Sequence, residues 1–98
     1  MQKLLVVKVG GNIIDNAAAL DSFLANLAAI DGHKILVHGG GKLATELSTQ
    51  LNIPTQMVEG RRITDTETIK VVTMTYAGWV NKTIVAQLQA KGCTAIGL

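Results

Sequence analysis

The sequence predicts an α/β protein in which helices and a mainly parallel sheet form three layers, α/β/α. Two short apolar runs, at residues 4–9 and 35–37, are typical of strands buried in a parallel sheet. Each run is followed by glycines and then by a segment with apolar residues at helical spacing. This β-α-β-α order favours right-handed crossovers, and the nearly continuous apolar character of residues 4–9 predicts cover on both faces.

Length and composition argue against some classes of function. The chain has 98 residues, of which 48% are hydrophobic, so we expect one domain with a real core. A net charge of +2 and one residue each of Phe, Tyr and Trp argue against a nucleic-acid partner. No apolar run approaches the ~20 residues of a membrane span. With Cys93 as the lone cysteine, the composition fits a soluble, cytoplasmic protein.

Two helices are predicted after the two apolar runs. Asp15 or Asn16 can cap the first, which we expect to end near Ile30 before a turn signal at residues 31–32. The second follows the glycines at 39–41 and stops near Pro54, because proline disfavours helix in the residue before it. The first helix should face the sheet through Leu20, Phe23, Leu24 and Leu27.

The second half of the chain predicts a hairpin, a long helix and a last strand. Residues 56–63 could form a hairpin that turns at Glu59–Gly60, and Thr64-Asp-Thr-Glu67 fits a capping box that opens a helix to about Ala90. Gly78 within that helix hints at close packing. Residues 94–98 look like a further buried strand. One side of the long helix is expected to carry Ile69, Val72, Tyr76, Val80 and Ile84.

Three consecutive glycines, Gly39–Gly41, interrupt the chain between the second apolar run and its helix. A strand that passes through a turn without side chains into a helix start leaves several backbone N–H groups pointing outward. These donors and the helix dipole favour an anion, and the missing Cβ atoms let it approach closely. We therefore expect the loop to hold a carboxylate or a phosphate.

Charged side chains near these glycines have two interpretations each. Lys8 either extends to solvent at the strand end or faces an anionic ligand at the carboxyl edge of the sheet. Arg61 and Arg62 are either solvated or, near a ligand loop, supply bidentate recognition of a carboxylate. His38 could make a structural hydrogen bond or act as a base.

Two phosphate-binding motifs and metal binding can be tested on the sequence. A P-loop is excluded because Leu43 stands where Ser or Thr should follow Gly41-Lys42. The dinucleotide fingerprint is matched loosely by residues 39–44, with Glu59 about twenty positions later, as that motif requires. No metal site is predicted, because His33 and His38 lack Cys or carboxylate partners at ligand spacing.

Four motifs in a fixed order resemble a known family. They are Lys8-Val-Gly-Gly11, Val-His-Gly-Gly-Gly41, Gly-Arg-Arg-Ile-Thr64 and Asn81-Lys-Thr83. Together they closely resemble the N-terminal half of the amino acid kinase family, over essentially the whole chain, and within it the branch that acts on N-acylglutamates. The portion formed by Gly60, Arg62, Ile63 and Thr64 separates this branch from carbamate, uridylate and aspartate kinases.

The resemblance implies a phosphate side of the site. Lys8 matches the lysine that stabilises the transferring phosphoryl group, and Gly10 and Gly11 match glycines whose backbone approaches the nucleotide phosphates. The expected cofactors are ATP and the Mg²⁺ that it carries, with no protein ligand for the metal in this chain.

The resemblance also implies an amino-acid side. Gly40 and Gly41 match main-chain contacts to the acylated substrate, and Arg62 matches the arginine that grips its α-carboxylate. The expected activity is ATP-dependent phosphorylation of the γ-carboxylate of N-acetyl- or another N-acyl-L-glutamate in arginine biosynthesis. The motifs do not select the acyl group. A homodimer through the long helix, residues 65–90, is expected.

The family continues beyond these motifs with an ATP-binding half that carries an asparagine, an aspartate and a second lysine. We therefore expect residues 1–98 to be the N-terminal, acylglutamate-binding portion, and the 98-residue chain alone to be inactive. Two alternatives stay open at this point: a non-catalytic ligand-binding or dimerisation module, and a dinucleotide-binding oxidoreductase fragment.

Overall fold

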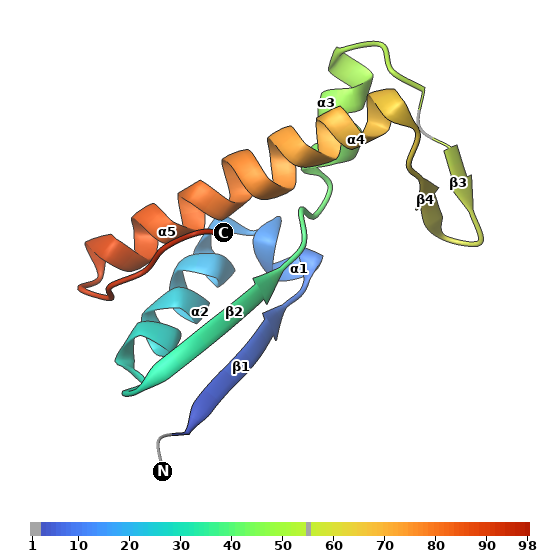
Figure 1. Cartoon of the computed structure of the whole chain (residues 1–98). Coiled ribbons are helices and arrows are strands. Elements are labelled where there is room, and N and C mark those ends of the chain that lie inside the picture. The colour runs from blue at the N-terminus through green and yellow to red at the C-terminus, as the bar shows by residue number, and fades with distance from the viewer. Residues whose placement is uncertain (1–2, 55) are drawn as a thin grey trace.

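The chain forms a parallel strand pair, a separate hairpin and one long helix that runs between them (Figure 1). The computed structural model describes residues 3–54 and 56–98, and the side chains of Gln56 and Arg62 lie outside that description. In order, the elements are β1 (Leu4–Val9), α1 (Gly11–Ile14), α2 (Ala17–Ala29), β2 (His33–His38), α3 (Leu43–Gln50), β3 (Gln56–Val58), β4 (Arg61–Ile63), α4 (Thr66–Val72), the π-helical segment η1 (Thr73–Val80) and α5 (Asn81–Ala90).

The first two strands pair in parallel, as the sequence predicts. Leu4 lies opposite His33 and Val9 lies opposite His38, so the strands are in register along their whole length. The α/β class with a parallel sheet is therefore confirmed. Because parallel strands end at the same edge, the glycines that follow β1 and β2 are brought to one place.

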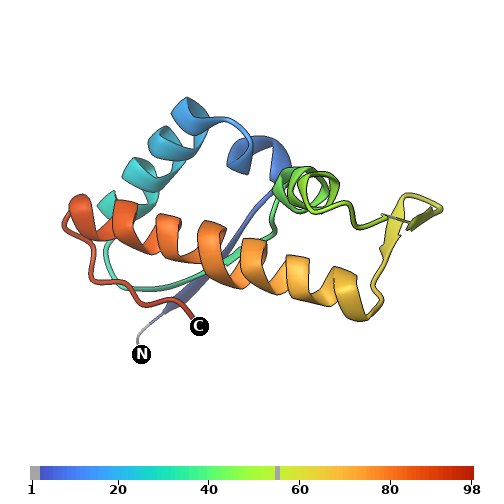
Figure 2. The same cartoon turned by 90° about the horizontal axis from the view of Figure 1, so that it is seen from above.

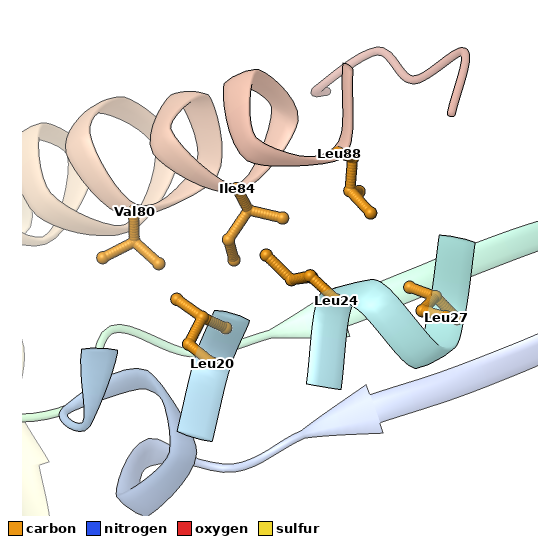
Figure 3. Packing of buried hydrophobic residues seen from close by; sticks show 6 residues of the cluster. All are labelled: Leu20, Leu24, Leu27, Val80, Ile84 and Leu88. Carbon is orange, nitrogen blue, oxygen red and sulfur yellow. The ribbon is translucent and has the colours of Figure 1, made fainter. Parts of the chain in front are cut away.

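The core lies between α2 and α5, on one face of the strand pair. Figure 3 shows six side chains pointing toward one another, three from α2, one from the last residue of η1 and two from α5: Leu20, Leu24, Leu27, Val80, Ile84 and Leu88. Val7 and Leu36 pack against this cluster from the sheet, and Phe23 is partly buried beside it. The expectation that the first helix faces the sheet through these leucines is confirmed.

The opposite face of the strand pair is exposed. Side chains alternate along a strand, so Leu4, Val6 and Lys8 share this face with Ile35 and Val37 of β2. Val6 is 61% exposed and Val37 is 46% exposed. The expected cover on both faces of β1 is wrong for this chain, because α2 and α5 pack on the other face. The radius of gyration, 15.0 Å, agrees with this open arrangement, since a compact domain of this length has about 13 Å.

Local interactions explain several helix ends. Asn16 caps α2 through a hydrogen bond from the Ala19 amide to Asn16 Oδ1 (3.0 Å). The Lys34 ammonium donates to the carbonyls of Leu27 and Ile30 at the other end of that helix, where a positive charge is favourable. Residues with left-handed backbone conformation follow the carboxyl ends of two other helices, Asn52 (φ 58°) after α3 and Gly92 (φ 81°) after α5.

The long helix differs from the expectation at its start and on its buried side. Asp65, not Thr64, is the N-cap: its side chain accepts a hydrogen bond from the Thr68 amide (2.8 Å). The close packing expected at Gly78 is also absent from the described structure, because a Cβ there would meet only the Thr73 carbonyl at 3.6 Å, an ordinary contact. None of the described helices is both long enough and apolar enough to cross a membrane.

The π-helical segment η1 changes which residues of the long helix are buried. The buried positions are Thr68, Val71, Thr75, Val80, Ile84 and Leu88, so one step in the series is five residues long. Ile69, expected on the buried side, is 48% exposed. The predicted face is wrong in the first half of the helix, because a regular 3.6-residue period does not continue through η1.

The last residues do not form the expected strand. Residues 93–98 run back along α5 without strand pairing. Side chains of α5 hold the segment instead: Lys82 Nζ donates to the Gly97 carbonyl (3.2 Å) and Gln89 Nε2 donates to the Ala95 carbonyl (3.0 Å). A strand needs a hydrogen-bonded neighbour, and a groove of about 800 Å³ separates this segment from β2.

The hairpin of β3 and β4 is confirmed. Its strands are antiparallel, with Val58 opposite Arg61. The two turn residues, Glu59 (φ 51°) and Gly60 (φ 77°), both have positive φ, which is the geometry of a tight type I′ turn. The hairpin projects beyond the amino end of α4 (Figures 1 and 2).

Candidate functional site

Two backbone corners follow the parallel strands: the first corner is Gly10–Gly11, after β1, and the second corner is Gly39–Gly41, after β2. The structure places them in contact. A Cβ atom on Gly11 would lie 3.3 Å from the Gly41 Cα, which is closer than most such contacts. Four of the predicted site residues, Gly10, Gly11, Gly40 and Gly41, are therefore brought together.

Backbone donors are available at both corners. In the part of the chain that the structure describes, the amides of Gly40 and Gly41 donate no hydrogen bond, although Gly40 is buried. The short helix α1 begins at Gly11 without a side-chain cap, so its first amides lack intrahelical partners. Buried backbone N–H groups are almost always paired, so these donors suit an anionic ligand.

Lys8 lies at the carboxyl end of β1, two residues before Gly10. Its side chain is exposed on the uncovered face of the strand pair, opposite Val37. Within residues 3–54 and 56–98, Lys8 Nζ makes no hydrogen bond or ion pair with a described side chain. Its ammonium is therefore free to meet an anion beside the corners, and its role in phosphoryl transfer stays a prediction.

The second corner is shaped by side chains that the sequence analysis did not assign to the site. A Cβ on Gly40 would overlap the aromatic ring of Tyr76, and a Cβ on Gly41 would overlap the carboxylate of Asp15. Gly41 also has a φ of 60°, which side chains rarely tolerate. The glycines are therefore required by packing as well as by any ligand. A local sequence pattern does not predict contacts between residues so far apart in the sequence.

His38 ties the second corner to the long helix. Its Nδ1 lies 2.8 Å from the Gly39 carbonyl oxygen, and its Nε2 lies 3.1 Å from Asn81 Nδ2. A carbonyl oxygen only accepts, so we assign the proton to Nδ1, and Nε2 then accepts from the Asn81 amide. The structural alternative for His38 is confirmed, and it leaves neither ring nitrogen free to act as a base.

The remaining predicted residue, Arg62, is not brought to the corners by the described atoms. Its backbone lies in β4, and its side chain lies outside the described part of the structure. Figure 1 shows this hairpin well separated from the ends of β1 and β2. The contact between Arg62 and a substrate carboxylate stays a prediction.

A cleft of about 470 Å³ opens beside the second corner. Charged and aromatic residues line it, among them Asp15, Lys42, Glu46 and Trp79, together with the backbone of Gly40. Trp79 is 68% exposed. Among the described residues, no three His, Cys, Asp or Glu side chains gather closely enough to hold a metal ion.

The sequence profile of the Amino acid kinase family matches residues 3–98. The chain belongs to the amino acid kinase family. Membership agrees with the glycine corners and favours a kinase over the dinucleotide-binding alternative.

Curated relatives cover this chain almost completely. It is 64% identical over 98 residues to a Cytophaga hutchinsonii protein named Acetylglutamate kinase, covering 100% of this chain and 37% of that protein. It is 60% identical over 97 residues to the protein of the same name from Bacteroides fragilis, covering 99% of this chain and 37% of that protein. The chain thus spans a little over a third of the length of these relatives, at their N-terminal end.

Solved structures show the same fold. The crystal structure of smu.665 from Streptococcus mutans UA159 matches with a TM-score of 0.74 at 24% identity, over 94% of this chain and 38% of that one. N-acetylglutamate synthase from Neisseria gonorrhoeae, complexed with coenzyme A and L-arginine, matches with a TM-score of 0.61 at 19% identity, over 95% of this chain and 21% of that one. At these identities the likeness concerns the fold.

Proposed function

We propose that this chain is the amino-acid side of an acetylglutamate kinase, which phosphorylates the γ-carboxylate of N-acetyl-L-glutamate, or a close N-acyl relative, in arginine biosynthesis. The observation that carries the proposal is the contact between the two glycine corners beside Lys8, at the carboxyl ends of β1 and β2. The names of the relatives at 60–64% identity support the same activity.

The chemistry needs no protein base. The nucleophile is the substrate's own γ-carboxylate, which has a pKa of about 4.3 and is ionised at neutral pH. This agrees with a site in which both nitrogens of His38 are engaged in hydrogen bonds. The difficulty is electrostatic instead, because two anions must be brought together in line.

The residues of this chain address that difficulty by position and charge. The amides of Gly40 and Gly41 are the proposed donors to the acylated amino acid, and Arg62 is the proposed partner of its α-carboxylate. Gly10 and Gly11 let phosphates approach the backbone, and Lys8 neutralises charge on the phosphoryl oxygens. Mg²⁺ carried with ATP would neutralise further phosphate charge. We assign ATP binding to the part of the relatives' length that this chain does not span.

The exposed apolar residues of the long helix support a homodimer through residues 65–90. Ile69, Met74 and Trp79 are 48%, 53% and 68% exposed. Large apolar side chains grouped on one element are typical of protein–protein contacts. Dimerisation through this helix is testable by measuring the mass of the full-length protein in solution, with Trp79→Ala expected to favour the monomer.

The activity is tested with the full-length protein, ATP, Mg²⁺ and N-acetyl-L-glutamate, by trapping the acyl phosphate as a hydroxamate. We expect ATP-dependent hydroxamate with N-acetyl-L-glutamate and much less with unacylated L-glutamate. A longer acyl group in parallel reports the acyl preference. The isolated 98-residue chain is expected to give none.

Two outcomes would contradict this proposal. Absence of hydroxamate with every N-acylglutamate would favour a non-catalytic ligand-binding or dimerisation module. Saturable binding of NAD, measured by titration alongside ATP, would favour the dinucleotide-binding alternative.

A further inference from the structure

Asp15 links the two glycine corners, although it belongs to neither. Its Oδ1 accepts a hydrogen bond from the Lys42 amide (2.9 Å), across 27 positions of sequence. The same oxygen lies directly over the Gly41 Cα, where a Cβ atom would overlap it. One carboxylate therefore contacts the last glycine of the second corner and the residue after it.

The carboxylate is itself held in place from the first corner. Asp15 is the C-cap of α1, and its amide donates to the Gly11 carbonyl (2.8 Å). A continuous chain of bonds thus runs from Gly11 through Asp15 to Lys42. It supplements the direct contact between Gly11 and Gly41, neither of which has a side chain.

The negative charge of the Asp15 carboxylate is also favourable at the start of α3. Lys42 is the N-cap of α3 and makes no side-chain cap hydrogen bond, so that helix start has no local cap. Asp15 supplies a negative acceptor there, where a helix start favours one. Part of the anion-binding capacity predicted for the start of α3 is therefore used by the chain's own carboxylate, while the amides of Gly40 and Gly41 stay available.

We infer that Asp15 is a positioning residue, which fixes the separation between the phosphate corner and the amino-acid corner. Its kinetic consequence rests on the proposed function: in-line transfer between two bound anions requires that the two corners keep a constant distance. A displacement of about 1 Å between reacting groups can lower turnover by roughly a hundredfold. Asp15 does not need to touch either reactant to have this effect.

The test compares three variants of the full-length protein: Asp15→Ala, Asp15→Asn and Asn16→Ala. Asp15→Ala removes the acceptor, whereas Asp15→Asn keeps an oxygen in the same place. Asn16→Ala is the matched control, because it also removes a helix-capping hydrogen bond, to Ala19, but reaches only its own helix α2. Each variant is measured for melting temperature, for kcat and for KM toward both substrates.

We expect Asp15→Ala to lower kcat by about ten- to a hundredfold with KM values changed by less than about threefold. Asp15→Asn should restore kcat to within about fivefold of the original protein. Asn16→Ala should lower the melting temperature as much as Asp15→Ala does, while its kcat stays within about twofold. Unchanged kcat in Asp15→Ala, or an equal loss of kcat in Asn16→Ala, overturns the inference.

Hydrogen exchange separates this inference from the proposed activity. Amides in residues 39–46 should exchange faster in Asp15→Ala than in Asn16→Ala, because only the former loses the bond to Lys42. If the original protein phosphorylates no N-acylglutamate, the proposed function fails, and faster exchange at residues 39–46 still supports the link. If exchange there is unchanged in Asp15→Ala, the link itself is wrong.

Discussion

The residues assigned to the amino-acid substrate occupy two regions that are built very differently. The second glycine corner is fixed on three sides, by Tyr76, by Asp15 and by the bond between His38 and Asn81. The hairpin that carries Arg62 has strands that contact each other more than they contact any other element. The second corner is therefore held in place before a ligand binds, whereas the conformation of the hairpin depends on its own turn.

This difference suggests a division of labour. A preorganised corner supplies geometry, because its donors need not be rearranged when the substrate binds. A projecting hairpin with an arginine supplies charge, which acts over a greater distance than a backbone contact. Substitutions in the hairpin and at or beside the glycine corners should therefore have different effects, and the following experiments test that separation.

Arg62→Ala should give the largest effect, on substrate binding. Removing one partner of a desolvated charge pair costs about 2–5 kcal/mol, so KM for N-acetyl-L-glutamate should rise by roughly thirtyfold to several thousandfold. Steady-state kinetics of the full-length enzyme measure this, with the neighbouring Arg61→Ala as the control. Equal effects of the two substitutions would mean that the hairpin contributes only a general positive charge.

Lys8→Ala should act on turnover instead. Loss of one group that stabilises transition-state charge lowers kcat by about a hundred- to a thousandfold, or roughly 2.7–4 kcal/mol, with little change in KM. The control is Lys70→Ala, which removes an exposed lysine paired with Glu67 on α4. A rise in KM without loss of kcat would assign Lys8 to binding and would remove the contrast with Arg62.

Gly40→Ala tests whether the corner is as tightly packed as the structure indicates. The new methyl group would overlap the Tyr76 ring, and overpacking of this kind costs about 1–3 kcal/mol of stability. The free energy of unfolding, measured by urea titration, should recover part of that loss when Tyr76→Ala is added. Gly78→Ala is the control: it has room for a methyl group and should be neutral or stabilising by up to about 1 kcal/mol.

The smallest effect concerns the helix start beside the hairpin. The hydrogen bond from the Thr68 amide lowers the pKa of Asp65 below its ordinary value. A carboxyl whose pKa is lower in the folded state stabilises it above the unfolded pKa, about 3.9, and loses this contribution as pH falls through the folded pKa. Urea midpoints should therefore fall on acidification more steeply in the original protein than in Asp65→Asn, which keeps an acceptor but does not titrate. Parallel curves would show that the cap is insensitive to charge.

Local chemistry made much of the fold predictable. Both parallel strands, the cap at Asn16, the turn at Glu59–Gly60 and the end of the long helix at Ala90 follow from patterns a few residues long. The last segment, residues 94–98, had the composition of a strand but lacks a hydrogen-bonded neighbour, and that condition is not local. Pairing depends on what lies beside a segment in space.

The site was predictable from the sequence to about the same extent as the fold. Bare backbone after two strands pointed to the glycine corners, and the strand register brought the corners together. Asp15 and Tyr76 were missed as corner residues because their contacts with Lys42 and Gly40 join distant parts of the sequence. The first appeared only as a possible helix cap, and the second only as part of an apolar helix face.

The five-residue step in the long helix has a consequence for how its length can vary. In an uninterrupted α-helix, five residues turn by roughly 500°, which would carry Val80 about 140° away from the side that Thr75 occupies. The first half of the long helix packs on α3 and the second half packs on α2. Because of η1, one continuous helix can make both contacts. Deleting one residue within 76–79 would restore a four-residue step and leave both packings aligned. The same deletion in α5 would rotate Ile84 or Leu88 out of the core. Where related proteins have a shorter long helix, we therefore expect the deletion to lie in η1.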